Sequence, residues 1–420
     1  MICLLPHCAY LSETSRMLEI HRALTALGIP VRVATHGGPH ERLLAGIPYD
    51  VLGAGLSPDR AARLVRSAIG LGDPRESMYD DDEIRSYVQA EAEYFRAHGI
   101  TVAVTGFTLT TLLSSRLAGV RLVTEHAGSF VPPVFERRLL PAPTRPVDPR
   151  LKHAPGWLSR FLINRTTNRT TGYCGGFNRV AESLGTEGIP SLSALLLGDL
   201  SLVPEVPEVL GVPAADLAAW TPHGRVGYRP NSRLRAIGPL FAHLDLPLPA
   251  RVQKFLDQPG PILYLAMTST PPARIREAVT ALSALDARIL VAGTIHDLAD
   301  LATSQVMIEG TLPSHLVMPQ VDLAVTTTGQ GSVQTAMASG TPLLGIPLHI
   351  EQDLNVALVE RLGAARHATP VDDLAALAAQ MLDTPRYREA AGRIQNLYAA
   401  ADGPADAADV IARLEPSNHG

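Results

Sequence analysis

Short apolar runs alternate with helix-like segments along this chain, and this pattern leaves few folds open. The apolar runs Ile2–Leu5 and Val31–Thr35 flank an amphipathic stretch, Thr14–Leu27, that ends at a glycine. Two strands joined by a helix at this spacing form a βαβ unit, whose strands are parallel. The same alternation predicts a helix, a strand, a helix and a strand further along: Glu83–His98, Val102–Val104, Thr108–Leu117 and Leu122–Thr124.

The second half of the chain repeats this pattern with longer apolar runs. Ile262–Met267 is continuously apolar, which is typical of a strand buried on both faces of a parallel sheet. The other expected elements are helices over Arg274–Leu285 and from Ser332 and Asp353, and strands over Ile289–Ala292, Val306–Ile308, Leu323–Thr326 and Leu343–Ile346. The sequence therefore predicts an α/β protein of two Rossmann-like, doubly wound parallel-sheet domains that face each other.

The length of the chain agrees with two domains, because 420 residues exceed the size of one ordinary hydrophobic core. We expect an N-terminal domain over residues 1–228, an interdomain linker over the proline-dense residues 229–249, and a second domain over residues 250–395. A C-terminal helical segment, residues 396–420, is expected to pack back on the N-terminal domain. The Pro- and Arg-rich segment Pro132–Pro155 is expected to be a long surface excursion, a kind of loop that often carries function.

The composition argues against several classes of protein. A net charge of −5 gives no basic field for nucleic acid. The three cysteines, Cys3, Cys8 and Cys174, are too few and too scattered for a disulfide framework or a zinc cage, which favours a reducing, cytoplasmic setting. The first apolar stretch is short, lacks a basic leader and is broken by Pro6, so it does not resemble a signal peptide. Because no run of about 18 apolar residues occurs, no membrane span is expected.

The stretch Val321–Ala365 carries the most chemical information. A predicted strand leads into a loop of small residues, Thr327-Thr328-Gly329-Gln330-Gly331, and a helix is expected to open at Ser332. Glycines let backbone amides approach an anion, and a helix N-terminus supplies free N–H groups and a favourable dipole, so a diphosphate fits this loop. A tight strand-to-helix turn capped by Ser332 explains the same residues without any ligand.

The order of residues in this stretch resembles the donor signature of GT-B glycosyltransferases of the glycosyltransferase family 1 type. The matching residues, in chain order, are Gly329, Ser332, Gly340-Thr341-Pro342, Pro347, Glu351-Gln352 and Asn355. Other landmarks of the family are similar to segments elsewhere in the chain, namely Arg16–Leu27, Gly28–Thr35, Ile237–Leu240, Ile262–Thr270 and Gly310–Pro313. The resemblance covers most of the chain and is strongest over residues 305–365.

The resemblance implies that residues 250–395 bind a nucleotide-sugar donor and that residues 1–228 bind the acceptor. Glu351 and Gln352 would hydrogen-bond the sugar hydroxyls, and Leu312 would pair with the base through its backbone. A surface acid beside a helix start is the simpler interpretation of Glu351. The groups implied to hold the diphosphate are Thr327, Gly329, Gln330, Gly331, Ser332 and Val333, assisted by Ser269 or Thr270.

The donor loop departs from the family pattern. Thr327 stands where the family has a histidine, and Thr328 stands where it has a glycine. A threonine hydroxyl still donates to a phosphate oxygen but carries no charge, so we expect leaving-group stabilisation to be weaker by about 1.5–3 kcal/mol. The first strand of this domain is followed by Thr268-Ser269-Thr270, where the family has a Gly-Ser loop.

The expected proton acceptor also departs from the family pattern. In the family a histidine just before the first helix takes the proton of the acceptor, and alignment on Leu18–Leu24 places Glu13 at that position. A carboxylate acts as a general base when burial raises its pKa. A helix dipole would instead lower the pKa of Glu13, and a plain N-terminal helix acid is the alternative interpretation. The usual aspartate partner is missing from Val102–Phe107.

Two histidines are candidates for contacts with the acceptor. His7 lies in the first loop, and His126 follows a predicted strand. Each is also explained as a packed, hydrogen-bonded structural residue. The His and Glu residues do not have the spacing of a metal site, so neither a metal ion nor a cofactor is expected.

These features predict an inverting transfer of a sugar from a uridine or thymidine diphosphate sugar to a hydroxyl or amine of a small acceptor. Bacterial members of the family decorate natural products, including antibiotics, so an acceptor of that class is expected. Two alternatives stay open: a non-catalytic glycosyltransferase-like partner protein, because both family histidines are missing, and a sugar-nucleotide epimerase of the same fold. A homodimer is an assembly that the sequence leaves open.

Overall fold

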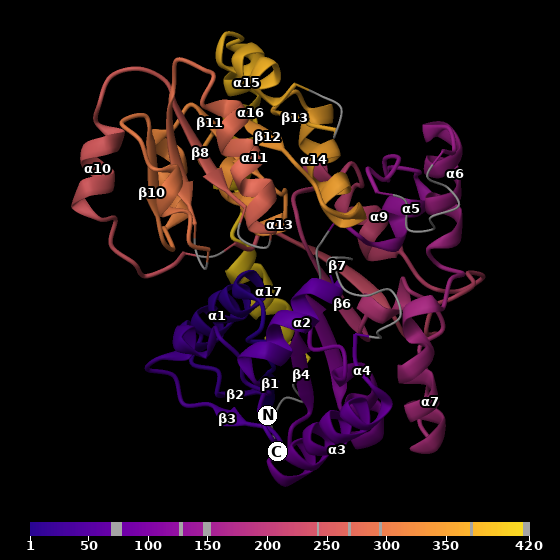
Figure 1. Cartoon of the computed structure of the whole chain (residues 1–420). Helices are drawn as coiled ribbons and strands as arrows, with labels where there is room; N and C mark the ends of the chain where they lie inside the picture. The colour runs from indigo at the N-terminus through magenta and orange to yellow at the C-terminus, as the bar shows by residue number, and fades with distance from the viewer. Residues whose placement is uncertain are drawn as a thin grey trace. The chain divides into compact units, whose positions relative to one another are not determined.

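The computed structural model describes residues 1–68, 78–125, 129–145, 153–241, 243–267, 270–293, 296–369 and 373–414. The chain divides into two compact units. Unit 1 comprises Met1–Leu140, Arg160–Leu240 and Asp402–Gly420, and unit 2 comprises Pro141–Ser159 and Phe241–Ala401. Each unit contains one parallel sheet flanked by helices (Figure 1), which confirms the predicted α/β class with two doubly wound domains.

The sheet of unit 1 has seven strands in the order β3-β2-β1-β4-β5-β6-β7, and every neighbouring pair is parallel. Its order reverses between β1 and β4, where the chain changes from one side of the sheet to the other. The strands are β1 (Ile2–Leu4), β2 (Val31–Thr35), β3 (Asp50–Val51), β4 (Val102–Thr105), β5 (Arg121–Glu125), β6 (Leu200–Pro204) and β7 (Arg233–Ile237).

The helices of unit 1 fill the connections between these strands, and one comes from the end of the chain. They are α1 (Leu11–Ala26), α2 (Pro58–Ala68), α3 (Asp81–Ala97), α4 (Thr111–Ala118), α5 (Pro132–Glu136), α7 (Gly175–Ser183), α8 (Pro207–Leu210), α9 (Ala214–Ala219) and α17 (Gly403–Ala412). Helix α6 (Gly156–Thr166) spans a boundary between the two units.

Successive side chains of β1 point to opposite faces of the sheet. Ile2 and Leu4 join an apolar cluster with residues of α1 and α17, whereas Cys3 and Leu5 join a second cluster with residues of α2, α3, α4 and α7. The period of two along a strand explains this division, and it makes both faces of the sheet buried. The continuous apolar character of the strands follows from these two layers.

The sheet of unit 2 has six parallel strands in the order β10-β9-β8-β11-β12-β13. Its strands are β8 (Ile262–Ala266), β9 (Arg288–Ala292), β10 (Val306–Glu309), β11 (Leu323–Thr326), β12 (Leu343–Gly345) and β13 (Ala365–His367). Its helices are α10 (Ala250–Leu256), α11 (Pro272–Leu282), α12 (Ser314–Val317), α13 (Gln330–Ala338), α14 (Ile350–Arg361), α15 (Leu374–Leu382) and α16 (Arg386–Ala399). Helix α11 packs with α15, and α13 packs with α16.

The expected linker differs from the structure, because β7 lies within residues 229–249 and forms the edge strand of the sheet of unit 1. Its backbone pairs with β6 over the whole strand, from Leu200 opposite Arg233 to Pro204 opposite Ile237. Backbone groups paired in this way cannot act as a free tether. Unit 2 also takes in Pro141–Ser159, which the expected boundaries assign to the N-terminal domain.

The C-terminal helix α17 packs on α1 and β7 of unit 1. Its first residue, Gly403, lies against the backbone that follows β7: a Cβ there would approach Pro239 O to 2.2 Å and Gly238 O to 2.4 Å. A backbone oxygen cannot yield as a flexible side chain can, so only glycine fits this contact. This close approach holds the start of α17 against the backbone that leaves the sheet after β7.

We expect Gly403→Ala to lower the free energy of unfolding of unit 1 by about 1–3 kcal/mol, because the added methyl group forces the helix off the sheet. Urea unfolding followed by circular dichroism measures the loss. Gly175→Ala is the matched control, because Gly175 also opens a helix of unit 1 and a Cβ there meets only the tip of Arg179 at 3.6 Å. Equal stability of the two variants would contradict the proposed contact.

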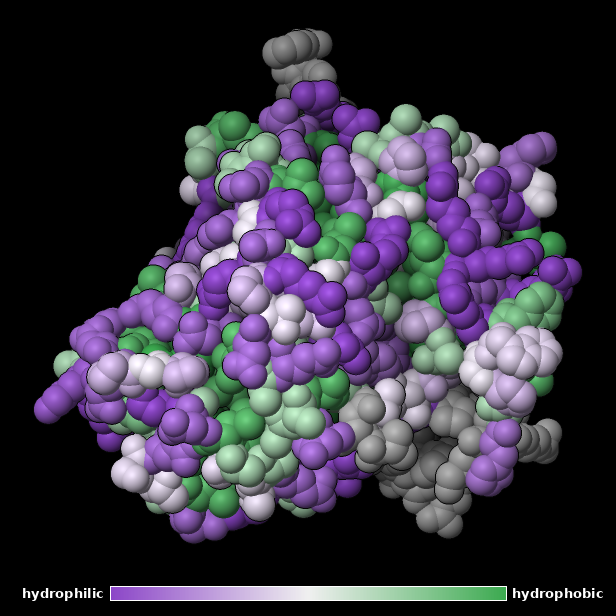
Figure 2. Space-filling model, turned by 90° about the horizontal axis from the view of Figure 1, so that it is seen from above, coloured by the Kyte–Doolittle hydropathy of each residue, from purple (hydrophilic) through white to green (hydrophobic). Residues whose placement is uncertain are grey.

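None of the helices within the described residues is both long and apolar enough to cross a membrane. Hydrophilic and hydrophobic residues are interspersed over the face drawn in Figure 2.

Candidate active site

The residues expected to bind a donor lie on loops, or in the first turns of helices, that follow four strands of unit 2. Thr270, Leu312, Thr327 and Glu351 follow β8, β10, β11 and β12, respectively. In a parallel sheet the carboxyl ends of all strands lie at the same edge, and ligands bind there. The fold of unit 2 therefore brings these four segments to one edge of one sheet.

The loop between β11 and α13 differs in one detail from the expectation. Helix α13 begins at Gln330, two residues before Ser332, and Gly329 is its N-cap residue. The N–H groups of Ser332 and Val333 donate to Gly329 O at 3.0 and 3.1 Å, so neither is free for an anion. Among the described residues, Gly329 and Gly331 find no acceptor for their N–H groups, which leaves these amides at the mouth of the helix.

Thr328 has a φ of 58°, in the left-handed region where the family has a glycine. A β-branched residue is an outlier there, at a cost of about 1–2 kcal/mol. Its hydroxyl donates to Gln352 O at 2.9 Å, and its carbonyl accepts from Asn355 Nδ2 at 3.1 Å. Helix α14 thus holds the loop in a strained conformation, and such strain is concentrated at functional sites.

Glu351 and Gln352 lie in the first turn of α14 and make different contacts. Glu351 Oε1 accepts from Asn355 Nδ2 at 2.6 Å, and its other oxygen lies 3.8 Å from His349 Nδ1. The Glu351 side chain is only partly buried, at 20% exposure. Gln352 is 5% exposed, and its Oε1 accepts from Leu348 N at 2.8 Å. Glu351 is therefore the more accessible of the two groups expected to bind the sugar.

Thr270 and Leu312 are the other described residues that the sequence analysis expects to bind the donor. Thr270 is 2% exposed and lies two residues before α11, and its buried hydroxyl finds no partner among the described residues. Leu312 is 4% exposed and lies between β10 and α12, where the hydroxyls of Tyr264 and Ser314 are hydrogen-bonded at 2.9 Å. Ser269, the alternative to Thr270, lies outside the described residues.

Glu13 lies in the first turn of α1 and is 2% exposed. Its Oε1 accepts from the N–H groups of Gly106 and Phe107 at 3.0 and 3.2 Å, and its Oε2 accepts from His7 N at 2.6 Å. The carboxylate thereby joins the loops that follow β1 and β4. Gly106 permits the approach, since a Cβ there would lie 2.6 Å from Glu13 Cγ.

Burial raises the pKa of Glu13 to about 6, against the opposing effects of Arg16 and of the three N–H donors. The helix start alone was expected to lower this pKa, so burial outweighs the helix dipole. A pKa near neutrality suits a general base. The contacts give Glu13 a structural role as well, because they fix two loops.

A second buried carboxylate, which the sequence analysis missed, lies next to Glu13. Glu125 ends β5, is fully buried, and accepts from Arg16 Nε at 2.8 Å. Its Oε1 has no hydrogen-bond partner among the described residues. Burial raises the pKa of Glu125 to about 7, the charge of Arg16 opposes this rise, and the charge of Glu13 adds to it. Glu13, Arg16 and Glu125 form a buried charged cluster at the carboxyl edge of the first sheet.

His7 uses both ring nitrogens within unit 1. Nδ1 accepts from Ala9 N at 3.4 Å, and Nε2 lies 3.1 Å from the hydroxyl of Tyr79. Burial, with the charge of His36, lowers the pKa of His7 to about 3, so the ring is neutral at physiological pH. His126, the other histidine expected near the acceptor, lies outside the described residues.

The excursion after α5 is attached to the carboxyl edge of the sheet of unit 2, a contact that no local pattern in the sequence indicates. Thr144 N donates to Asp353 Oδ2 at 3.0 Å, and its hydroxyl bonds Asp353 Oδ1 and lies 2.9 Å from His367 Nε2. Asp353 is fully buried and lies two residues after Glu351. Thr144 therefore contacts the first turn of α14, the same turn that contains Glu351.

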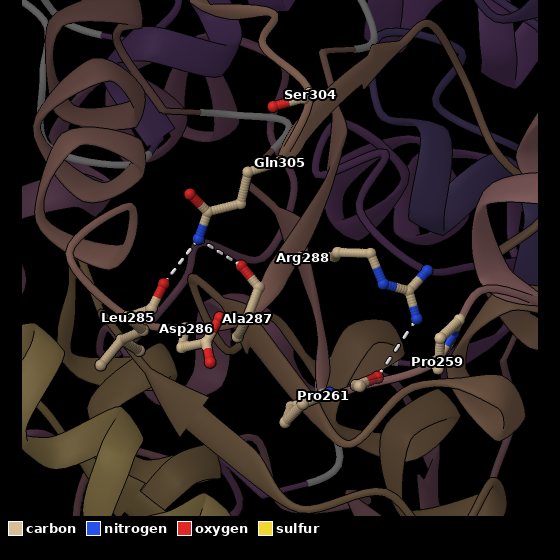
Figure 3. A pocket seen from close by; sticks show the side chains of 9 residues that line it. Pro259, Pro261, Leu285, Asp286, Ala287, Arg288, Ser304 and Gln305 are labelled. Carbon is tan, nitrogen blue, oxygen red and sulfur yellow. Dashed lines mark hydrogen bonds between the residues drawn. The ribbon is translucent and has the colours of Figure 1, made fainter.

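A pocket of about 590 Å³ lies at the opposite edge of the second sheet (Figure 3). Its lining comes from residues before β8, β9 and β10 and from Arg288, the first residue of β9, so it is at the amino ends of these strands. Gln305 Nε2 donates to Leu285 O and Ala287 O at 2.5 Å, and Arg288 donates to Gly260 O at 3.1 Å. These polar groups are thus hydrogen-bonded to backbone oxygens of the chain itself. The loops of the donor signature lie at the other edge of the sheet.

Sequence comparison relates this chain to known sugar transferases. Residues 237–410 match the family model of UDP-glucoronosyl and UDP-glucosyl transferase. The chain is 32% identical to 4'-demethylrebeccamycin synthase of Lentzea aerocolonigenes over 166 residues, which is 38% of this chain and 39% of that protein. It is 24% identical to the PGL/p-HBAD biosynthesis glycosyltransferase of Mycobacterium tuberculosis (strain ATCC 25177 / H37Ra) over 328 residues, 76% of this chain and 72% of that protein.

Structural comparison extends the likeness to the whole chain. The crystal structure of glycosyltransferase VinC in complex with DTDP aligns over 99% of both chains, with a TM-score of 0.66 and 16% sequence identity. The chain is a glycosyltransferase homologue with the GT-B fold. The segment that matches the family model includes Leu312, Glu351, Gln352 and the stretch from Thr327 to Val333. Glu13 and His7 lie outside this segment.

Proposed function

We propose that this chain is an inverting glycosyltransferase that moves a sugar from a nucleotide diphosphate sugar to a hydroxyl or amine of a small natural product. Unit 2 binds the donor and unit 1 binds the acceptor. The acceptor oxygen or nitrogen attacks C1 of the sugar, the bond from C1 to the phosphate oxygen breaks, and the nucleoside diphosphate leaves. The proton of the acceptor passes to Glu13.

One observation carries this proposal: the loops of the donor signature converge at the carboxyl edge of unit 2, within the segment that matches the family model. The strained Thr328, held by Gln352 and Asn355, supports a functional role for this loop. Amides at the mouth of α13 and the hydroxyl of Thr270 offer donors to the phosphates, and Glu351 offers an acceptor to the sugar hydroxyls. The reaction as proposed needs neither a metal ion nor a cofactor.

The nucleotide and the acceptor class come from the related proteins. VinC was crystallised in complex with DTDP, so a thymidine diphosphate sugar is the first donor to test, with the uridine equivalent second. The name of 4'-demethylrebeccamycin synthase points to a natural product as the acceptor.

The proposal is tested by incubating the purified chain with thymidine and uridine diphosphate sugars and a panel of apolar natural-product acceptors. We expect release of the nucleoside diphosphate only when an acceptor is present, with an inverted anomeric bond in the product by NMR. A retained anomeric configuration would contradict the inverting mechanism.

Two other outcomes would replace the proposal. Donor binding without any release of nucleoside diphosphate, across the whole panel, would identify a non-catalytic partner protein, which the missing histidine at Thr327 makes a specific alternative. Conversion of the donor alone into an isomer would identify an epimerase.

A further inference from the structure

The donor loop offers a departing diphosphate no positive charge of its own. Residues Thr327 to Val333 contain neither a basic nor an acidic side chain. In an enzyme that expels a nucleoside diphosphate, stabilisation of the developing negative charge is the largest electrostatic contribution to catalysis. On the proposed function, the missing cation must come from another part of unit 2.

Arg145 is one cation brought to this edge by the fold. The preceding residue, Thr144, is fixed by hydrogen bonds to the buried Asp353, in the first turn of α14, and to His367, the last residue of β13. Arg145 is partly buried and has no ion-pair partner among the described residues. Burial and the charge of Arg274 lower its pKa, and the charge of Asp353 opposes this.

Arg274 is the second cation. It lies in the first turn of α11, which contains no acidic residue, and its nearest carboxylate is that of Glu277 at 3.8 Å. A cation at a helix N-terminus is repelled by the helix dipole, so this placement does not help the fold. The buried, unpartnered hydroxyl of Thr270 lies just before the same turn.

The order of the strands places the two arginines on either side of the donor loop. Helix α11 follows β8 and α14 follows β12, and β11, which leads into the donor loop, lies between these two strands in the sheet. Because Thr144 is bonded to Asp353 of α14, Arg145 lies on the β12 side of this loop, and Arg274, in the first turn of α11, lies on the β8 side. Two neighbouring cations that are not closely paired with carboxylates repel each other, and an anion bound between them removes this repulsion.

We propose that Arg145 and Arg274 bind the diphosphate of the donor from the two sides of the α13 mouth and stabilise the leaving group where the family histidine is missing. Arg145 belongs to the excursion after α5, which the bond between Thr144 and Asp353 attaches to unit 2. The excursion is therefore part of the proposed donor site. Guanidinium groups bind phosphate oxygens through paired N–H donors, which suits a diphosphate better than a single threonine hydroxyl does.

The test is calorimetric binding of thymidine diphosphate and of thymidine to the full chain, with the uridine pair in parallel. We expect Arg145→Gln and Arg274→Gln each to weaken diphosphate binding by about 10-fold to 100-fold, while nucleoside binding changes by less than about twofold. Arg145→Lys and Arg274→Lys keep a charge and should recover part of the affinity. Arg276→Gln is the matched control, because this exposed arginine of α11 is paired with Asp300 and should bind both ligands as the wild-type chain does.

The possible results separate this inference from the proposed function. Unchanged diphosphate affinity in both glutamine variants would overturn the role of the two arginines and leave the transferase proposal intact. An equal loss of affinity for nucleoside and diphosphate would also overturn it, since that would show a distorted loop. A wild-type chain that binds neither diphosphate would contradict the proposed function itself.

Discussion

Glu13→Gln lowers kcat by about 100-fold to 10,000-fold with a saturating donor, because the amide cannot accept the proton of the attacking group. The wild-type chain should show a kcat/KM that rises with pH through about 6, the pKa to which burial raises Glu13, and the variant should lose this acidic limb. Steady-state assays of nucleoside diphosphate release between pH 5 and 8 measure both effects. The acidic limb is the sharper readout, since a merely structural role does not produce it.

A stability cost accompanies this kinetic effect and has to be separated from it. In Glu13→Gln an amide NH₂ replaces one carboxylate oxygen and faces a backbone N–H, either that of His7 or those of Gly106 and Phe107. Because two donors then face each other, we expect the free energy of unfolding to fall by about 1–3 kcal/mol. Glu91→Gln is the matched control: this buried carboxylate pairs with His36 Nε2 at 2.7 Å and accepts from two hydroxyls of α4 and its N-cap, outside the proposed reaction. If Glu13→Gln keeps its kcat and its acidic limb, Glu13 only fastens the loops.

Arg16→Met lowers the free energy of unfolding of unit 1 by about 3–5 kcal/mol at pH 8, because it leaves the fully buried Glu125 without a cation. Both carboxyls of the cluster have raised pKa values, about 6 for Glu13 and about 7 for Glu125, against an ordinary 4.5. The folded state therefore binds their protons more tightly than the unfolded state does. Their contribution favours folding below about pH 4.5 and is lost as the pH rises to about 7.

The loss in Arg16→Met should consequently depend on pH. Without the cation, the two pKa values rise further and the stability falls more steeply between pH 5 and 8, so the variant should be close to the wild-type chain at pH 5. Urea unfolding at the two pH values measures the difference. Arg22→Met on the same helix is the control, since this exposed arginine pairs with Glu19 at 3.0 Å and is worth less than about 1 kcal/mol. A loss in Arg16→Met that is equal at both pH values would argue for lost packing instead of charge.

The sequence allowed most of the two sheets to be predicted, because their strands are apolar throughout and separated by amphipathic helices. Four strands were not predicted, namely β3, β6, β7 and β13. In β7, Arg233 and Arg235 are exposed and alternate with buried Leu234, as expected for an edge strand, and nearby prolines favour the interpretation as a linker. Only its pairing with β6 makes this segment a strand. An edge strand with charged positions has no apolar run by which it can be recognised.

The donor loop was predictable as a local pattern, but its details were not. The shift of the helix start from Ser332 to Gln330 depends on Gly329 acting as N-cap, which a serine nearby concealed. The role proposed for Arg145 could not be inferred from the sequence, because the position of this residue depends on the bond between Thr144 and Asp353, which are 209 residues apart. The raised pKa of Glu13 likewise depends on burial by residues of several strands and loops.

The return of α17 to unit 1 has a consequence for the construction of hybrid enzymes. Unit 2, for which donor binding is proposed, is not a C-terminal cassette, since Ala407, Ala408 and Ile411 fill the same apolar layer as residues of α1. A hybrid with a relative's donor half should therefore keep its own residues from Asp402 onward and rejoin the parent sequence there. The exchange also has to include Pro141–Ser159, because this segment belongs to unit 2 and Thr144 is bonded there to Asp353 and His367.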